Sequence, residues 1–363
     1  MKKKMIGMFF VAATIISTST GRSEDNDVLT DTLADMAKSF IESKNQLLVT
    51  GYSNITPEQH PLSPSFKKLV QSDSGKILNQ RESLISDGQE YSDFHTKLTV
   101  REKKVSKTKV VLRADEHTVL NLNKSSVDLS APKTTEYVNE HILTFVKGKD
   151  GEWELSSDEL VNAPAPASPV PGEKKIKGIK PTSTNEYRYY PQERDAEQRT
   201  YAAYSSLNRT AIVNYAYRYW SSYNPSYRSY PADCTNFVSQ AVYSGGWYFV
   251  SGLYTSNNAW WYNYLNQTRT WAGAHNWFQF TKQRPRGYIA RYFSDMQPGD
   301  ILQADLNRDG TIDHSMIVTK KDSSGIIYLT YHTSNTKDKS INSVRSSYPN
   351  ALYYGWRLYS SIY

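Results

Sequence analysis

A long stretch with almost no large apolar side chains divides the chain into two parts. Residues 161–190 contain the run NAPAPASPVPGEKKIKGIK, which is rich in proline and alanine and then in lysine. This composition cannot bury a core and favours an extended linker with polyproline character. Because the 363-residue chain is also longer than a typical single domain, we expect two globular units, at residues 28–160 and 191–363.

The N-terminus, residues 1–23, has the features of an export signal. It starts MKKK, continues with a short apolar core from Met5 to Ile16, and then becomes small and polar. The apolar run is too short to predict a transmembrane span. Cleavage near residues 20–23 is the expected outcome, and an uncleaved membrane anchor is the alternative. We therefore expect a secreted or cell-wall-associated protein with no stable membrane span after cleavage.

Residues 28–160 show two helical patterns followed by several strand patterns. Apolar residues recur at helical spacing in the first part, and runs that favour strands follow. The predicted helices are 31–45 and 66–82, and the predicted strands are 96–105, 107–122, 136–147 and 152–155. Helices before an antiparallel meander predict a smaller α+β domain with a curved sheet. The pattern resembles the cone-shaped folds related to nuclear transport factor and ketosteroid isomerase, and we expect a spacer or docking role.

Cys234 is the only cysteine in the chain. In an exported protein, a lone thiol cannot form an internal disulfide and needs another explanation. Apolar residues follow it at helical spacing, Asp233 occupies an N-cap position, and Gly245 stands where such a helix should end. At the start of a helix, the macrodipole favours the thiolate. Cys234 is therefore a candidate nucleophile, and a small buried apolar residue is the alternative.

Two histidines downstream are candidate partners of this thiol. His314 precedes the apolar run SMIVT, and a second run, IIYLTYH, ends at His332, shortly before Asn335. A neutral histidine can accept the thiol proton and return it to a leaving amine. A polar residue on the neighbouring strand can orient the ring. This prediction requires an imidazole in contact with the sulfur of Cys234.

The segments DCTNFVSQ, PGD and HSMIVT follow one another in an order that carries a family resemblance. They resemble the bacterial cell-wall cysteine peptidases and amidases of the papain-like fold, of the NlpC and CHAP types. With NRTAIVNYAYRYW and YHTSN added, the part from about residue 201 is more similar to the amidase domain of secreted Gram-positive bacterial proteins. The resemblance implies a papain-like α+β domain with Cys234 as nucleophile and His314 as base. It gives His332 or Asn335 the third role, and Asp233 could support the site.

The function expected from these features is hydrolysis of an amide bond by a secreted thiol enzyme. Export and the family resemblance indicate peptidoglycan or another cell-wall polymer as the substrate and partner. One alternative is a non-catalytic cell-wall or spore-surface binding protein that retains the fold, and another is a transglutaminase-like acyl transferase. The formal net charge is +7, but there is no long basic run or nucleic-acid motif, so nucleic acid is not an expected partner.

Residues 305–313, DLNRDGTID, match the beginning of a calcium loop. Asp305, Asn307 and Asp309 stand at the first, third and fifth positions. The twelfth position is Met316, where such loops place a bidentate glutamate, and the flanks have strand patterns. We therefore predict a hairpin loop, with calcium as the weaker alternative, and no other metal or cofactor.

Overall fold

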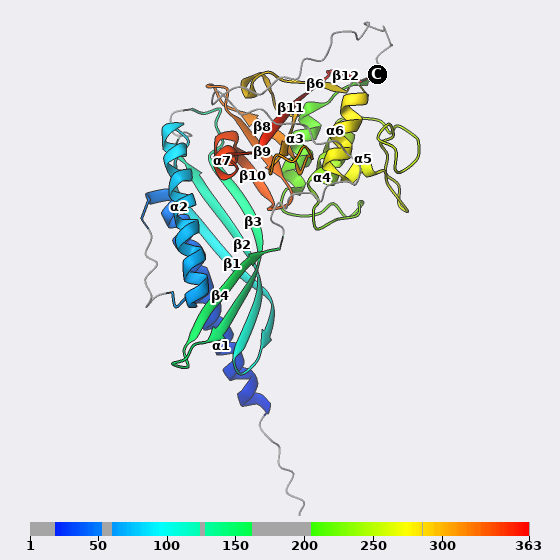
Figure 1. The fold of residues 1–363 in the computed structure, drawn as a ribbon. Coiled ribbons are helices and arrows are strands. Elements are labelled where there is room, and N and C mark those ends of the chain that lie inside the picture. Colours follow the sequence, from blue (N-terminus) through cyan, green and yellow to red (C-terminus); the bar gives the residue numbers. More distant parts are fainter. Residues whose placement is uncertain (1–18, 53–59, 124–127, 162–204, 285, 363) are drawn as a thin grey trace, which may run out of the picture.

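The computed structural model describes residues 19–52, 60–123, 128–161, 205–284 and 286–362. Two α+β units share one open sheet of ten strands (Figure 1). The strand order is β1-β2-β3-β10-β9-β8-β7-β11-β6, and β4 pairs with β3 beside that path. All of these pairings are antiparallel. The predicted α+β class is therefore confirmed, and the papain-like assignment of the C-terminal unit stays a prediction.

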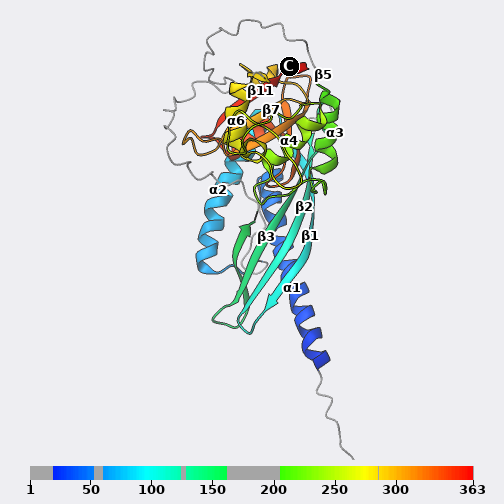
Figure 2. The ribbon, with the colours of Figure 1, turned by 90° about the vertical axis from the view of Figure 1, so that its right-hand side faces the viewer.

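The N-terminal unit combines two helices with four long strands. Its elements are α1 (Ser19–Thr50), α2 (Pro64–Ser86), β1 (Tyr91–Val105), β2 (Lys109–Leu122), β3 (Thr134–Lys147) and β4 (Trp153–Leu160). Each predicted helix and strand is present, with longer bounds in most cases. The helices pack against each other and against the strands (Figure 2). Phe40, Phe66 and Phe145 belong to the buried apolar cluster that this packing creates.

The prediction placed the start of the first helix at residue 31, whereas α1 begins at Ser19. Its first turns extend beyond the sheet (Figure 1), and the sequence STGRSEDND at the start of α1 has no apolar spacing from which a helix could be predicted. Residues 1–18 of the predicted export signal lie outside the described residues. None of the helices in the described part of the chain is long and apolar enough to cross a membrane.

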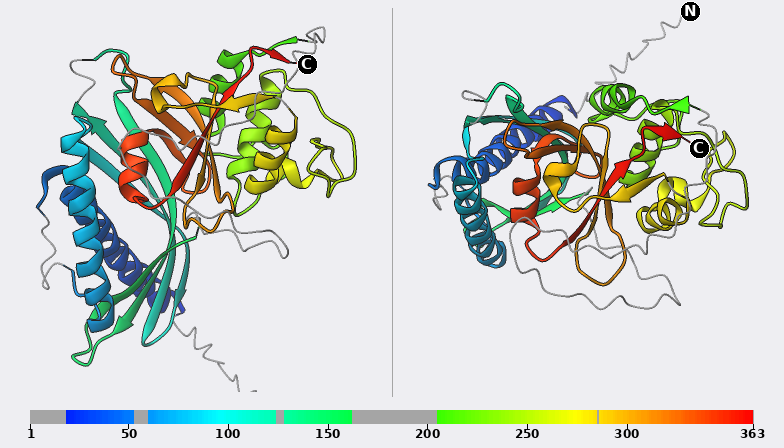
Figure 3. Two further views of the ribbon diagram at one scale, coloured as in Figure 1. Left: turned by 45° about the horizontal axis from the view of Figure 1, so that its top comes forward. Right: turned by 90° about the horizontal axis from the view of Figure 1, so that it is seen from above.

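The C-terminal unit places helices on both faces of its part of the sheet. Its helices are α3 (Arg209–Tyr219), α4 (Cys234–Ser244), α5 (Arg269–Ala272), α6 (Ala274–Gln283) and α7 (Ile341–Ser347). Its sheet strands are β6 (Gly287–Ile289), β7 (Ile301–Asp305), β8 (His314–Lys321), β9 (Ile327–Tyr331), β10 (Thr336–Ser340) and β11 (Leu352–Leu358). The short strands β5 (Ser205–Ser206) and β12 (Ser361–Ile362) pair separately. Helices α3, α4 and α6 share one buried cluster with the sheet, and α7 packs in another (Figure 3).

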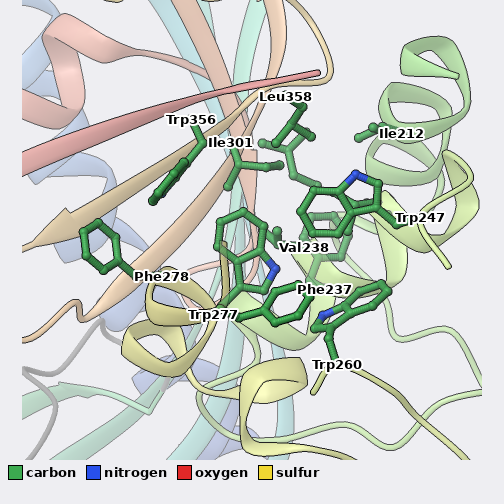
Figure 4. Packing of buried hydrophobic residues seen from close by; sticks show 14 of the residues in the cluster. Ile212, Phe237, Val238, Trp247, Trp260, Trp277, Phe278, Ile301, Trp356 and Leu358 are labelled. Carbon is green, nitrogen blue, oxygen red and sulfur yellow. The ribbon is translucent and has the colours of Figure 1, made fainter. Parts of the chain in front are cut away.

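Tryptophan side chains dominate the core beneath α4 (Figure 4). Trp247 and Trp277 stack with ring centroids 5.7 Å apart. Trp260 donates its indole N–H to Ser239 of α4 at 3.1 Å, and Trp271 donates to Asn236 at 2.7 Å. Trp260 and Trp271 thus combine a large apolar contact area with a satisfied donor, whereas the indole N–H of Trp277 has no partner among the described residues. The cysteine helix α4 therefore packs against a cluster of buried tryptophan rings.

A short seam between β3 and β10 joins the two units. The paired residues are Thr336 with Tyr137 and Lys337 with Glu136. The backbone N–H of Val138 also donates to the carbonyl of Asn335 at 2.7 Å. Around the seam, Thr333, Ser334 and Asp338 have positive φ angles of 66°, 66° and 54°, a left-handed backbone that is unfavourable for residues other than glycine. Most of the predicted linker, residues 162–190, lies outside the described residues.

Candidate active site

Cys234 is the first residue of α4, as the sequence predicts, and the helix ends at Ser244 before Gly245. Its side chain is 5% exposed. Thr235, the next residue, bonds through its hydroxyl to Ser315 of β8 at 2.9 Å. This contact holds the start of the cysteine helix against the start of the histidine strand.

The predicted capping role of Asp233 is wrong, although the residue does occupy the N-cap position. Its carboxylate makes no capping hydrogen bond. One oxygen accepts from the backbone N–H of Tyr230 at 3.0 Å and from the amide of Asn236 at 2.8 Å. The other lies 2.7 Å from Nδ1 of His332. Asp233 is thus directed to the side of α4, because an imidazole from the sheet competes for it.

The sulfur of Cys234 lies in a tight polar contact with its neighbours. The hydroxyl of Thr235 is 3.7 Å away, and the backbone of Ser315 also bonds to the sulfur. Burial raises the pKa of the thiol, and the nearby charge of Asp233 adds to that effect, while hydrogen bonds from the hydroxyl of Thr235 and from the backbone of Ser315 and Thr235 oppose it. The pKa of the thiol is therefore raised and not lowered as the sequence predicts, because burial outweighs the opposing hydrogen bonds, including that from the backbone of Thr235 in the first turn of α4.

His314 begins β8, one residue before the backbone that touches the sulfur. Since side chains alternate along a strand, and Ser315 faces α4, the ring of His314 lies on the opposite face. There it contacts Tyr331 edge to face at 4.9 Å. Neither ring nitrogen has a hydrogen-bond partner among the described residues, and burial lowers the pKa of His314 to about 3. The imidazole is neutral and is not hydrogen-bonded to the thiol of Cys234.

His332 lies close to the start of α4, but it contacts Asp233 and not the ring of His314 that it was predicted to orient. Its Nδ1 lies 2.7 Å from Asp233, and its Nε2 lies 2.7 Å from the carbonyl of Tyr219. The ring stacks on Phe237 at 4.1 Å. Asn335 lies at the seam, where its carbonyl accepts from β3. Because the ring nitrogens of His314 have no partner in the described part, neither His332 nor Asn335 orients that ring here.

The predicted hairpin loop at residues 305–313 is present, since β7 and β8 pair on either side of it. The carboxylate of Asp305 accepts from the backbone N–H groups of Asp309 and Gly310 at 3.2 and 2.9 Å. The side chain of Asn307 accepts from the same N–H of Asp309 at 2.9 Å. The described residues contain no group of three His, Cys, Asp or Glu side chains arranged to hold a metal ion. The loop is therefore organised by bonds to its own backbone.

The sequence analysis missed a buried polar cluster in the N-terminal unit. The ring of His141 lies 2.6 Å from Asp158 and 3.1 Å from Glu116, and Lys44 reaches Asp158 at 2.8 Å. Burial opposes charge on the ring, but the two carboxylates outweigh it and raise the pKa of His141 to about 9. The alternation of side chains along β2 could have revealed this cluster. Glu116 lies four residues after the buried Leu112 and therefore on the same, inward face of the strand.

Comparison with known proteins adds two findings to this geometry. Residues 206–356 match the family described as "Putative amidase domain". Cys234, His314 and His332 all lie within the matched segment. A Bacillus subtilis (strain 168) protein described as "Uncharacterized protein YhbB" is 29% identical over 144 residues, which cover 39% of this chain and 45% of that protein. The chain thus spans less than half of this relative, and the family match supports amide hydrolysis by the C-terminal unit.

Proposed function

We propose that the C-terminal unit is a secreted hydrolase that cleaves amide bonds with the thiol of Cys234 as its nucleophile. The observation that carries the proposal is the position of Cys234. The only cysteine of the chain begins α4 inside the segment that matches the amidase family. Its sulfur also has two hydrogen-bonding neighbours, Thr235 and the backbone of Ser315, and both favour the thiolate over the thiol.

The reaction follows from this placement. The thiolate attacks the amide carbonyl carbon, and the carbonyl oxygen gains the negative charge of the tetrahedral intermediate. The first N–H groups of α4, beginning with that of Cys234, are suited to stabilise this oxyanion, because a helix leaves its first N–H groups without intrahelical partners. The C–N bond then breaks and the amine leaves with a proton. Water hydrolyses the thioester, which releases the carboxylate and regenerates the thiol.

His314 is the proposed base for the thiol proton and the proposed acid for the leaving amine. Two features support this role: the ring is neutral at physiological pH, and its nitrogens are not committed to other described residues. The role requires a conformational change, because the ring and the sulfur lie on opposite faces of β8. Catalytic hydrogen bonds are often incomplete without substrate. Bringing the two groups together requires β8 to unpair from β7 at its first residue, where His314 lies opposite Ala304, and substrate binding is the step proposed to drive this change.

Peptidoglycan is the proposed substrate, and the proposed location is outside the cell or on its wall. The basic and apolar N-terminal residues support export. Exposed aromatic side chains near the cysteine helix support a polymer substrate, since such rings stack on sugars and peptides. Tyr264 is 91% exposed and Tyr254 is 51% exposed. Arg228 donates to the carbonyls of Asn263 and Tyr264 and thereby ties this loop to the segment that leads into Asp233.

Digestion of purified peptidoglycan by the exported protein, followed by mass analysis of the released fragments, tests the proposal. We expect fragments from one class of amide bond. Cys234→Ser should abolish their release while thermal unfolding stays unchanged, because the two side chains are similar in size. Met316→Leu, a buried substitution of similar volume, is the matched control and should retain activity. Fragments released by Cys234→Ser at the wild-type rate would reject the thiol mechanism.

A second function, wall binding without catalysis, is favoured by the closed state of the site. The thiol is 5% exposed, burial raises its pKa, and His314 does not contact it. This function predicts no released fragments and equal sedimentation of wild type and Cys234→Ser with purified cell walls. It also predicts that iodoacetamide alkylates Cys234 no faster than a free peptide cysteine. Incorporation of an added amine in place of hydrolysis would instead indicate acyl transfer.

A further inference from the structure

His332 connects three elements at the start of the cysteine helix. It follows the last residue of β9, its Nε2 lies 2.7 Å from the carbonyl of Tyr219 at the end of α3, and its Nδ1 lies 2.7 Å from Asp233. The ring also stacks on Phe237, one turn into α4. The side chains of His332 and Asp233 are 3% and 2% exposed, so these contacts are shielded from water.

The partners of this ring identify its protonation state. A backbone carbonyl only accepts hydrogen bonds, and an ionised carboxylate also only accepts them. With Asp233 ionised, both ring nitrogens of His332 are placed to donate, and this geometry suits the imidazolium form. The C-terminal end of α3 carries partial negative charge and favours a cation at this position. Asp233 supplies the full negative charge that a buried cation needs.

This pairing has a direct consequence for the thiol. Asp233 precedes Cys234, and a carboxylate charge beside a sulfur opposes its ionisation. The imidazolium offsets that charge at a distance of 2.7 Å. Without it, the carboxylate would remain buried beside the thiol with only neutral donors, the backbone of Tyr230 and the amide of Asn236.

We propose that His332 is a positioning residue that fixes the first turn of α4 and neutralises the charge of Asp233 beside the nucleophile. It is not the group that orients the base. This inference deepens the proposed function and rests on Cys234 being the nucleophile. In this proposal, the Asp233–His332 pair holds the thiol in place and balances the charge beside it. Proton transfer is left to His314.

Few other ionisable groups face this pair in the described structure. Tyr223 contacts the ring edge to face at 5.2 Å. Burial raises the pKa of Tyr223, and the charges of Asp233 and of Glu140 on β3 raise it further, so the phenol stays neutral below pH 10. Tyr215 on α3 also interacts with the charge of Asp233, and burial raises its pKa, so this phenol is neutral as well. Among the groups that the structure describes beside the pair, Cys234 is the remaining one, and a pH effect on alkylation is expected to come from the thiol.

The experiment measures the rate at which iodoacetamide alkylates Cys234 from pH 5 to pH 10 in the full chain. Because there is one cysteine, the signal has a single source. In His332→Gln, the carboxylate loses its counter-charge, and the midpoint of the pH profile should rise by about one unit. In Asp233→Asn/His332→Gln, both charges are absent, and the midpoint should return to the wild-type value. His95→Gln, an exposed substitution on β1, is the control and should leave the profile unchanged.

The double variant separates charge balance from simple structural support. Loosening of α4 alone would change the maximal rate in both His332 variants and leave both midpoints at the wild-type value, which would overturn the proposal. If His332→Gln does not fold, Asp233→Asn carries the test, because removal of the negative charge should lower the midpoint. A midpoint that stays constant in Asp233→Asn would also overturn it. Peptidoglycan release is scored separately, so loss of the proposed function does not alter this result.

Discussion

His141 in the N-terminal unit and His314 in the C-terminal unit are almost equally buried, at 3% and 4% exposure, yet their chemistry is opposite. His141 lies between Asp158 and Glu116, which overcome the effect of burial and raise its pKa to about 9. His314 has no hydrogen-bond partner in the described structure, and burial alone lowers its pKa to about 3. Burial by itself therefore does not determine the charge of a histidine; the groups that face the ring do.

The comparison also separates structural from reactive positions. Every polar group around His141 has a partner, including Lys44, which bonds to Asp158, and Asn45, which bonds to Glu116. A satisfied buried network of this kind rigidifies a fold. The unpaired ring of His314 instead leaves a polar group unsatisfied, at a cost of about 1–3 kcal/mol. The His314 ring, on the face of β8 opposite the cysteine helix, therefore does not contribute a hydrogen bond to the stability of the described fold.

The largest expected effect concerns His314. His314→Leu should lower peptidoglycan hydrolysis on the order of 100-fold to 10,000-fold, because general acid–base catalysis contributes that much. Its free energy of unfolding should stay the same or rise, since an unsatisfied polar group is replaced by an apolar one. Fragment release and chemical denaturation measure the two quantities, with Met316→Leu as the control. If His314→Leu keeps its activity but loses stability, His314 has a structural role and not a catalytic one.

The next largest effect concerns His141. His141→Leu leaves Glu116 and Asp158 buried without their shared cation, and breaking such a pair lowers the free energy of unfolding by about 3–5 kcal/mol. Hydrolysis per folded molecule should not change, because the cluster lies outside the candidate site. Urea unfolding at neutral pH measures the first quantity, and His95→Leu is the exposed control. A loss below about 1 kcal/mol would show that the cluster is not a structural network.

The third prediction uses pH to tell the two histidines apart. The folded pKa of His141 lies above the ordinary value of 6.5, so its stabilisation is complete below pH 6.5 and falls by about 3 kcal/mol between pH 6 and pH 9. The folded pKa of His314 lies below 6.5. Its contribution therefore falls as the pH drops from 6.5, by about 2 kcal/mol at pH 5.

Unfolding curves measured from pH 5 to pH 9 test this opposition. His141→Leu should lose the alkaline decrease in stability, and His314→Leu should lose part of the acidic decrease. Identical pH dependence in the wild type and both variants would contradict the opposite pKa shifts.

Local signals in the sequence were sufficient to predict the helices and strands of the N-terminal unit and the cysteine helix, but they did not define the contacts between elements. The helix Cys234–Ser244 could be predicted because its apolar spacing and its terminal glycine are all close in sequence. The contacts of the Asp233 side chain could not be predicted in this way. A capping bond and an ion pair with His332 would each satisfy the carboxylate, and the ion pair depends on a residue 99 positions away. Strand periodicity places His314 and Ser315 on opposite faces, but it does not say which face α4 covers.

The short seam between β3 and β10 affects how the protein would respond to mechanical tension. Only two residue pairs join the units there, whereas β1 and β2 pair along most of their length. Contacts between α2 and α7 and the hydrogen bond from Tyr328 to Gln89 also join the units, and a pulling force that breaks them would separate the seam as well. The left-handed residues Thr333 and Ser334 would then relax toward ordinary backbone angles, and His332, which precedes them, would lose its fixed position. Separation of the two units would in this way be transmitted to the thiol.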